Sequence, residues 1–298
     1  MSWQLGAFTL AMRLFLKPIL RRTTTPQAAR RDLGRAARLA KAPRFLLHLP
    51  DHPASGLHWI SVGSVNPDWV ILFCHGGGYL AGNPTTYAAM LGRLSKLTGL
   101  AVIAPDYRLA PEHPAPAAFD DVVAGHATLI AKGYAPDRII LGGDSAGGGL
   151  ALALLADLCA RNLRPAGLFG FSPWTDLAMT GSSLVENAAI DPVIPVERMA
   201  ETVARVTGAL AASDPRLSPL YASFDRPPPV WIQVGAGEVL RDDSRAITHL
   251  LRASGGRVAL TEWSGVPHVW HMLDGYLPEA RAALIETAGF IKGLIPRP

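Results

Sequence analysis

The most reactive arrangement in this chain is a serine placed in a glycine-rich turn between two apolar segments. Ser145 is the centre of Gly-Asp-Ser-Ala-Gly, residues 143–147, with a strand-like run before it at 138–141 and a helix-like run after it at 150–155. A serine at a sharp strand-to-helix turn is typical of an activated nucleophile. The turn pushes the hydroxyl out of the sheet and points N–H groups of the first helical turn at the group under attack. We therefore predict that Ser145 is a nucleophile.

A second glycine-rich loop precedes this serine by 70 positions. The apolar run 69–74 leads directly into His75-Gly76-Gly77-Gly78. Glycine backbone can approach a ligand closely and aim its N–H groups at the negative oxygen of a tetrahedral intermediate. Loops of this type supply part of such an oxyanion hole, and the residue after the nucleophile, which is Ala146, supplies another donor. We predict an oxyanion hole made by this loop and Ala146.

A serine nucleophile requires a general base, and the chain has nine histidines. When the nucleophile stands in a strand–turn–helix motif, the base follows it and an acid in chain order, which leaves His249, His268 and His271. His249 lies in a helical pattern and is expected to be a surface or packing histidine. His268 follows a loop of turn-forming residues, 264–267, at the end of a strand-like run. We predict His268 as the base, with His271 as the alternative.

The acid that orients this histidine should follow the preceding strand. The strand-like run 230–235 is followed by Ala236, Gly237 and Glu238, and Glu238 is the first carboxylate after the strand. A helix opens near residue 240, and a carboxylate at Asp242 in its first turn is favoured by the helix dipole without any catalytic role. We predict Glu238 as the acid that fixes the imidazole tautomer, with Asp242 as the alternative.

Other polar residues near these motifs are expected to be structural. The segment 106–116 contains Tyr107, Arg108, Glu112 and His113, which together resemble a catalytic cluster. His113 precedes the serine and therefore violates the required order. We expect this segment to support the oxyanion loop through hydrogen bonds and ion pairs. Asp144 is likewise expected to be structural.

These motifs together resemble a known family. The sequences at 75–78, 143–148, 106–112 and 214–220 are similar to those of bacterial hormone-sensitive-lipase-like (family IV) carboxylesterases of the α/β-hydrolase superfamily. The resemblance spans about residues 69–275 and assigns the catalytic serine to Ser145 and the histidine to His268. It assigns the oxyanion glycines to Gly76 and Gly77. The acid position usually carries aspartate in that family, whereas this chain has Glu238, which is one methylene longer.

The elements that must position these residues alternate along the chain, which predicts an α/β fold with a mostly parallel sheet and helices on both faces. Strand-like runs occur near 57–62, 69–74, 100–105, 138–142, 167–171, 230–235 and 257–262. Helix-like runs occur near 84–98, 116–132, 146–161, 240–253 and 277–293. The resemblance implies the α/β-hydrolase fold with a helical lid. We expect four parts: an N-terminal helical cap segment at 1–45, a core at 46–176, a cap insertion at 177–213 and a second core part at 214–298.

The N-terminal segment is strongly basic. Residues 1–44 contain ten Arg or Lys and one acidic residue, a net charge of +9, and because the whole chain carries +4 the remainder carries −5. The segment has apolar residues at helical spacing, but Pro18 is expected to kink or end that helix. We predict a lid over the active site, with Phe15, Trp174, Met179 and Leu184 as candidates for an apolar pocket wall. The alternative is a helix pair that touches an anionic membrane surface.

Composition narrows the possible classes of protein. Of 298 residues, 49% are hydrophobic and 17% are charged, which is enough for a large buried core. We expect Cys74 and Cys159 to be buried thiols. No dinucleotide, P-loop or metal-binding spacing is present, so we expect no cofactor, no metal and no nucleic-acid partner. A membrane-spanning segment and a secretory signal are not expected, which favours a cytoplasmic location, and an edge strand near 257–262 could form a homodimer.

These observations predict a serine carboxylic-ester hydrolase that acts on short- to medium-chain acyl esters through an acyl-enzyme. Two alternatives use the same scaffold: an amidase or formamidase with the same three residues, and a noncatalytic relative that binds a small molecule. A third alternative is a lipase recruited to membranes by its basic N-terminal helices.

Overall fold

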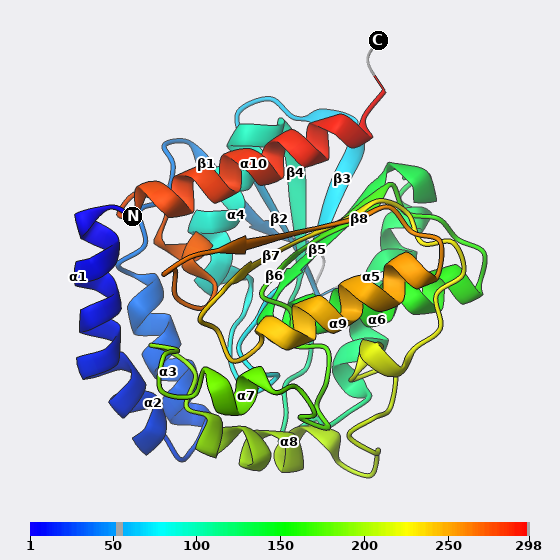
Figure 1. Ribbon diagram of the computed structural model, residues 1–298. Coiled ribbons are helices and arrows are strands. Elements are labelled where there is room, and N and C mark those ends of the chain that lie inside the picture. The colour runs from blue at the N-terminus through cyan, green and yellow to red at the C-terminus, as the bar shows by residue number, and fades with distance from the viewer. Residues whose placement is uncertain (52–55, 297–298) are drawn as a thin grey trace.

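The computed structural model describes residues 1–51 and 56–296. Within these residues the chain forms one eight-stranded sheet in the order β1-β2-β4-β3-β5-β6-β7-β8 (Figure 1). β2 pairs antiparallel with β1 and with β4, and the remaining pairs are parallel. The strands are β1 Leu46–Pro50, β2 Leu57–Val62, β3 Asn66–Cys74, β4 Leu100–Pro105, β5 Ile139–Asp144, β6 Gly167–Phe171, β7 Val230–Gly235 and β8 Val258–Trp263.

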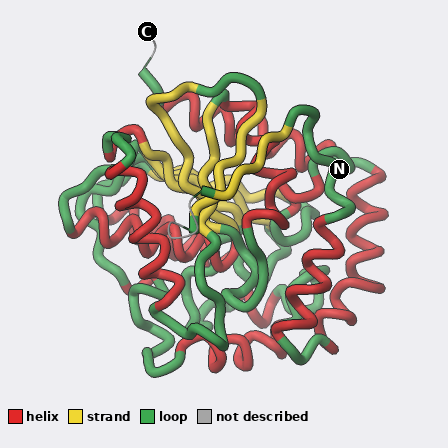
Figure 2. Tube along the Cα trace, turned by 180° about the vertical axis from the view of Figure 1, so that it is seen from behind, coloured by secondary structure: helices red, strands yellow, loops and turns green. Residues whose placement is uncertain are grey.

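Ten α-helices are described with this sheet. They are α1 Trp3–Ala11, α2 Lys17–Arg22, α3 Pro26–Ala37, α4 Pro84–Thr98, α5 Ala117–Ala131, α6 Ser145–Ala160, α7 Ser183–Glu186, α8 Met199–Thr207, α9 Arg241–Ala253 and α10 Pro278–Leu294. None of the described helices is both long and apolar enough to cross a membrane. Seen from behind, the strands form the middle of the molecule and helices lie on either side (Figure 2).

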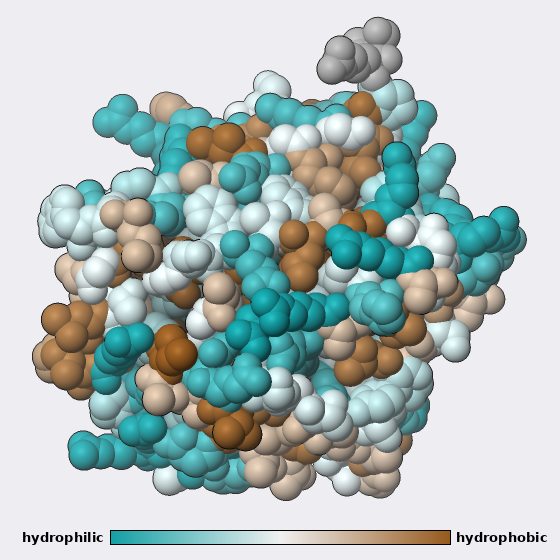
Figure 3. Space-filling model, in the orientation of Figure 1, coloured by the Kyte–Doolittle hydropathy of each residue, from teal (hydrophilic) through white to brown (hydrophobic). Residues whose placement is uncertain are grey.

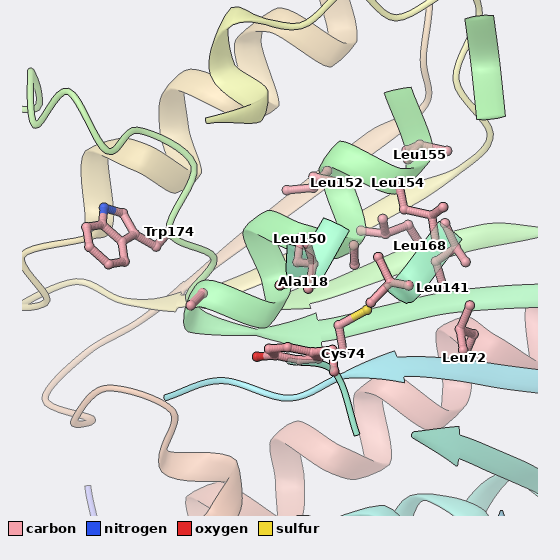
Figure 4. Close-up of a cluster of buried hydrophobic side chains, with 14 of the residues drawn as sticks. Leu72, Cys74, Ala118, Leu141, Leu150, Leu152, Leu154, Leu155, Leu168 and Trp174 are labelled. Carbon is pink, nitrogen blue, oxygen red and sulfur yellow. The ribbon is translucent and has the colours of Figure 1, made fainter. Parts of the chain in front are cut away.

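The central strands are apolar on both faces because helices cover both. In β3, Val70, Leu72 and Cys74 join the cluster that includes residues of α5, α6 and α9. Ile71 and Phe73 point the opposite way, into the cluster that includes residues of α4 and α10. Figure 4 shows leucines of α6 pointing toward side chains of β3, β5 and β6 in the first of these clusters. This alternation confirms the predicted α/β class and fixes β5 in the middle of the sheet.

Most of the predicted core elements are confirmed, with one omission at the sheet edge. Each of the seven predicted strands corresponds to one of β2 to β8, and the five predicted helices correspond to α4, α5, α6, α9 and α10. The strand β1 was not predicted, because its sequence Leu-Leu-His-Leu-Pro lacks a clear alternation of apolar and polar residues. At the opposite edge lies β8, where the homodimer contact remains a prediction.

The N-terminal segment (residues 1–45) and the insertion (residues 177–213) contact each other. Lys17 donates through Nζ to the carbonyl oxygens of Ala188 and Asp191, at 2.7 and 2.6 Å. Arg198 of the insertion donates to the carbonyl oxygen of Thr23 at 3.0 Å. In Figure 1, α1 and α2 follow the left edge of the molecule and meet the side on which α7 and α8 lie.

Pro18 does not end the first helical path, although the α-helix is interrupted just before it. The helical path continues to Arg22, and residues Met12–Leu16 form a π-helical stretch between α1 and α2. Proline lacks an N–H and its ring needs space in the preceding turn. A wider turn directly before it meets both requirements. The second helix of this basic segment, α3, begins at Pro26 and ends at Ala37.

Candidate active site

The serine turn lies at the carboxyl end of β5, in the middle of the sheet. Ser145 has a φ of 51°, and α6 begins at this residue. A non-glycine residue with positive φ is strained, and such strain is concentrated at functional sites. Gly147 is required for the tight packing, because a Cβ there would collide with the carbonyl oxygens of Cys74 and His75. The oxyanion loop and the serine turn are therefore in direct backbone contact.

Three side chains predicted from distant parts of the sequence meet in one hydrogen-bonded chain. His268 Nε2 lies 2.9 Å from Ser145 Oγ, and His268 Nδ1 lies 2.6 Å from Glu238 Oε2. A carboxylate only accepts hydrogen bonds, so Nδ1 carries the imidazole proton. Nε2 is then left to accept a hydrogen bond from the serine hydroxyl. This is the arrangement in which a histidine can remove the hydroxyl proton while a carboxylate stabilises the resulting imidazolium.

Glu238 is completely buried and its carboxylate is held from two sides. Oε1 accepts hydrogen bonds from the Ser172 hydroxyl at 2.7 Å and from the Gly235 N–H at 2.6 Å. Asn187 of the insertion donates to the Glu238 carbonyl oxygen at 2.8 Å. These contacts leave Oε2 to face the imidazole. The glutamate side chain, one methylene longer than aspartate, fits because its own loop turns back so that the Gly235 N–H binds its carboxylate.

The pKa of His268 is set by opposing influences. Burial lowers this pKa, while the negative charge of Glu238 and its hydrogen bond raise it, and the net result lies above the usual value of 6.5. The charges of Asp191 and Asp144 add to the upward shift. The imidazolium form is therefore stabilised, which is what a base needs in a transition state where it accepts a proton.

The alternative base and the alternative acid do not reach this chain of hydrogen bonds. His271 is buried against Phe171, with ring centroids 3.7 Å apart, and its Nε2 lies 2.9 Å from Gln233 Oε1. Asp242 instead accepts hydrogen bonds from Ser182 Oγ and the Ser183 N–H, at 2.8 and 2.9 Å. Both therefore have structural partners, and His249 is exposed.

One predicted oxyanion donor does not fit the geometry. The Gly76 N–H already donates to Asp144 Oδ1 at 2.8 Å, so the sequence-based assignment of Gly76 to the oxyanion hole is corrected. Gly77 and Gly78 have φ values of 118° and 63°. Within the described residues, their N–H groups and that of Ala146 have no hydrogen-bond acceptor. The open amides next to Ser145 are thus those of Gly77, Gly78 and Ala146.

The oxyanion loop is held by the buried polar groups that the sequence marked as structural. Asp144 Oδ2 accepts a hydrogen bond from the Tyr87 hydroxyl at 2.9 Å, while its other oxygen holds Gly76. Burial raises the pKa of Asp144 to about 7, although these two hydrogen bonds act to lower it. From the segment 106–116, Tyr107 donates to the His75 carbonyl oxygen at 2.6 Å and stacks on its ring. The predicted support role of this segment is confirmed.

Sequence reasoning missed Ser172, Gly78 and Asp191 in this site. Ser172 directly follows β6, so a polar side chain at the carboxyl end of a strand next to β7 was the available sign. Asp191 is buried and accepts the Val239 N–H at 3.0 Å, next to Glu238. No local pattern marks it, since it lies in the irregular insertion.

The pocket-wall roles of Trp174, Met179 and Leu184 stay predictions. Trp174 and Leu184 are buried. Phe15 is 66% exposed and points away from the protein interior, so its assignment to a pocket wall is wrong. Met179 is partly buried.

Comparison with known proteins gives consistent results. Residues 71–272 match the model of a family described as having the α/β hydrolase fold. An acetyl-hydrolase of Streptomyces hygroscopicus is 39% identical over 246 residues, covering 77% of this chain and 80% of that protein. The structure of an esterase from the bacterial hormone-sensitive lipase family superposes with a TM-score of 0.92, at 35% identity and with 99% of each chain covered.

A structure of the protein EstE5 soaked with p-nitrophenyl butyrate superposes with a TM-score of 0.92 at 32% identity, covering 99% of each chain. Like the first structure, this neighbour extends over the N-terminal segment and the insertion as well as the sheet. On the matched family model, the sequence identity and these superpositions, the chain belongs to the α/β-hydrolase family, in its bacterial hormone-sensitive lipase group.

Proposed function

We propose that the protein is a serine carboxylic-ester hydrolase that acts on short- to medium-chain acyl esters. The observation that carries this proposal is the hydrogen-bonded chain Ser145–His268–Glu238 at the carboxyl edge of the sheet. The relatives named acetyl-hydrolase and esterase support the same class of reaction. Cleavage of an ester by this arrangement requires only a nucleophile, a base and oxyanion donors.

In the first half-reaction, Ser145 Oγ attacks the ester carbonyl carbon while His268 Nε2 accepts the hydroxyl proton. The C–O bond to the alcohol then breaks, and the imidazolium returns its proton to the departing alkoxide. Ser145 is left as an acyl ester. In the second half-reaction, water attacks this ester, His268 accepts a proton from the water, and the same imidazolium protonates Ser145 Oγ as the acid product leaves.

The oxyanion hole in this proposal consists of the N–H groups of Gly77, Gly78 and Ala146. The backbone of Gly77 is fixed, since a Cβ there would collide with the carbonyl oxygen of Ala81. Donors held before the reaction starts stabilise the developing charge without reorganisation, and removing one such donor typically costs about 10²–10³ in rate. The support of the loop by Asp144 and Tyr107 is thus part of its catalytic function.

The N-terminal segment and the insertion form the lid in this proposal. A methyl group built on Gly78 would lie 3.7 Å from Cγ2 of Thr202, so α8 covers the oxyanion loop. Asn187 and Asp191 of the insertion bind the loop that carries Glu238. A lid attached both to the oxyanion loop and to the loop that carries Glu238 excludes water from the side of the site where the acyl group binds.

The test is a comparison of the wild-type protein with Ser145→Ala on a series of p-nitrophenyl esters from acetate to laurate. We expect turnover of acetate and butyrate, and a loss of about 10⁴–10⁶-fold in kcat in the variant with unchanged circular dichroism. Ser64→Ala, an exposed serine in a turn, is the matched control. Full activity in Ser145→Ala would overturn the proposal. Faster turnover of the matching p-nitroanilides than of the esters would favour the amidase alternative.

A further inference from the structure

Exposed large apolar side chains are concentrated in the first fifty residues. Of the fourteen such side chains in the described part of the chain, ten lie there: Met1, Trp3, Leu10, Leu14, Phe15, Ile19, Leu39, Phe45, Leu47 and Leu49. Scattered single apolar residues are normal on a protein surface, but a concentration of them marks an interaction site. A brown patch at the left edge of Figure 3 lies beside the lower half of α1 in Figure 1.

The helix α1 is apolar on two opposite faces. Leu5 is buried, and it packs with Phe8 against the cluster around Trp270. The opposite face carries Trp3 and Leu10, whose spacing of seven residues places them on one stripe, and Leu14 follows in the π-helical stretch. Their side chains are 79%, 58% and 59% exposed. A helix that is apolar all round is normally buried on all sides, so the outer stripe of α1 lacks its partner.

Positive charge accompanies this stripe. Residues 1–44 carry a net charge of +9, whereas the rest of the chain is net acidic at −5. Three of the ten cations in residues 1–44 pair with carboxylates: Arg21 with Glu197, Arg30 with Glu112 and Arg35 with Asp32. The other seven have no carboxylate partner among residues 1–51 and 56–296, and of these only Lys17 is buried. A strongly positive and partly apolar surface is complementary to a partner that has a negatively charged surface over an apolar interior.

Arg31 and Arg35 of α3 and Arg38, directly after its end, also line a groove. The groove lies between α3 and the first turn of α4, has a volume of about 670 Å³, and is lined by Arg31, Gly34, Arg35, Ala37, Arg38, Thr85 and Thr86. Guanidinium groups bind phosphate oxygens through two parallel hydrogen bonds. The groove therefore has the positive charge that a phosphate-bearing headgroup requires.

We propose that the N-terminal segment is a docking surface for an anionic phospholipid bilayer. Trp3, Leu10 and Leu14 enter the interface between headgroups and acyl chains, where tryptophan and leucine side chains are stable. Arg31, Arg35 and Arg38 bind the headgroup phosphates. The protein then lies on the membrane without crossing it. This inference goes beyond the hydrolase proposal and does not depend on it.

The experiment is co-sedimentation of the full chain with sucrose-loaded vesicles. One vesicle preparation is pure phosphatidylcholine and the other contains equal parts of phosphatidylcholine and phosphatidylglycerol. We expect binding to the anionic vesicles at 50 mM NaCl, at least tenfold weaker binding to the zwitterionic vesicles, and a strong reduction at 500 mM NaCl because salt screens the attraction.

Two variants separate the apolar and the electrostatic contributions. Leu10→Ser with Leu14→Ser removes two exposed leucines, and we expect at least tenfold weaker partitioning. Arg31→Gln with Arg35→Gln and Arg38→Gln removes three charges, and at about 1 kcal/mol for each charge we expect roughly 100-fold weaker partitioning. The matched controls are Ile285→Ser, which is 51% exposed on α10, and the triple change Lys96→Gln, Arg257→Gln and Lys292→Gln. Both controls should bind as the wild type does.

Three outcomes would overturn the proposal. One is the absence of wild-type binding to anionic vesicles at 50 mM NaCl. Another is equal weakening by the control and the test variants, which would show that only overall charge matters. The third is a concentration-dependent dimer in sedimentation velocity that is lost in the Leu10→Ser and Leu14→Ser variant, because a second copy of the chain would then cover this face.

Discussion

The carboxyl edge of the sheet and the N-terminal segment are stabilised in different ways. At the sheet edge, Glu238 and Asp144 are fully buried, and each carboxylate oxygen has a specific hydrogen-bond partner. In the N-terminal segment, apolar side chains face solvent and most cations lack a carboxylate. Buried polar groups that are fully paired have one stable arrangement, whereas a surface with unpaired groups keeps its capacity to bind. We therefore assign the proposed chemistry to the fully paired region and the proposed membrane contact to the other.

The two regions are connected at a few polar anchors. Lys17 holds the insertion through two carbonyl oxygens, and one of these belongs to Asp191, which binds the N–H next to Glu238. Arg30 of α3 donates to the carbonyl oxygens of Leu80 and Ala110, beside the oxyanion loop. Substitutions in the rigid region should thus change the reaction, while substitutions of the anchors should change stability.

The largest expected effect is that of Glu238→Gln compared with Asp242→Asn. The amide cannot stabilise the imidazolium and favours the wrong tautomer, so we expect kcat to fall about 10³–10⁴-fold. Asp242→Asn should keep kcat within about threefold, since its carboxylate binds Ser182 and Ser183 and not His268. Both values come from steady-state hydrolysis of p-nitrophenyl butyrate. A loss of activity in Asp242→Asn alone would show that the acid has been assigned to the wrong residue.

The pH dependence of kcat/KM is the second prediction. The base must be neutral, so activity is present above the pKa of His268 and is lost as the pH falls through it. Burial lowers the pKa of His268, whereas the charge of Glu238 and its hydrogen bond raise it, and the net shift is upward. The midpoint of the acid limb should therefore lie above 6.5. In Glu238→Gln the upward influence of Glu238 is removed while burial remains, so the midpoint should move to lower pH. An unchanged midpoint in that variant would contradict the role of Glu238.

The smallest effect on the reaction is expected at the anchor Lys17. Lys17→Met removes the donor to two carbonyl oxygens in a buried place, which costs about 2–3 kcal/mol in the free energy of unfolding. This corresponds to a decrease of roughly 4–10 °C in Tm. Arg44→Met, at an exposed arginine of the same segment, is the control and should leave Tm within about 1 °C. A loss in kcat as large as that of Glu238→Gln, without a change in Tm, would remove the distinction between the two regions.

The sheet and the reacting side chains could be predicted because local patterns determine them. Runs such as 69–74 are apolar throughout, since helices cover both faces of the sheet, and parallel strands end at one edge. Ser145, His268 and Glu238 all follow such runs closely. The chain order of the three residues then removes most alternatives.

The choice of oxyanion donors, the course of the helix at Pro18 and the direction of Phe15 depended on contacts between distant segments. The carboxylate of Asp144 accepts a hydrogen bond from the Gly76 N–H, so Gly76 is not free to bind an oxyanion. No spacing in the sequence reveals that bond. The path of the helix through Pro18 depended on a π-helical turn that propensity does not predict. Phe15 has the apolar character of a pocket residue, but its direction is set by how the whole helix packs, and it faces solvent.

The most direct test of the central claim, that His268 activates Ser145, is reaction with an organophosphate followed by mass spectrometry of the intact protein and its peptides. We expect one adduct, on the peptide that carries Ser145. The same adduct should form at least about 10³-fold more slowly in His268→Ala and at the wild-type rate in the Ser64→Ala control. An adduct on another residue, or modification of Ser145 at the wild-type rate in His268→Ala, would contradict the account.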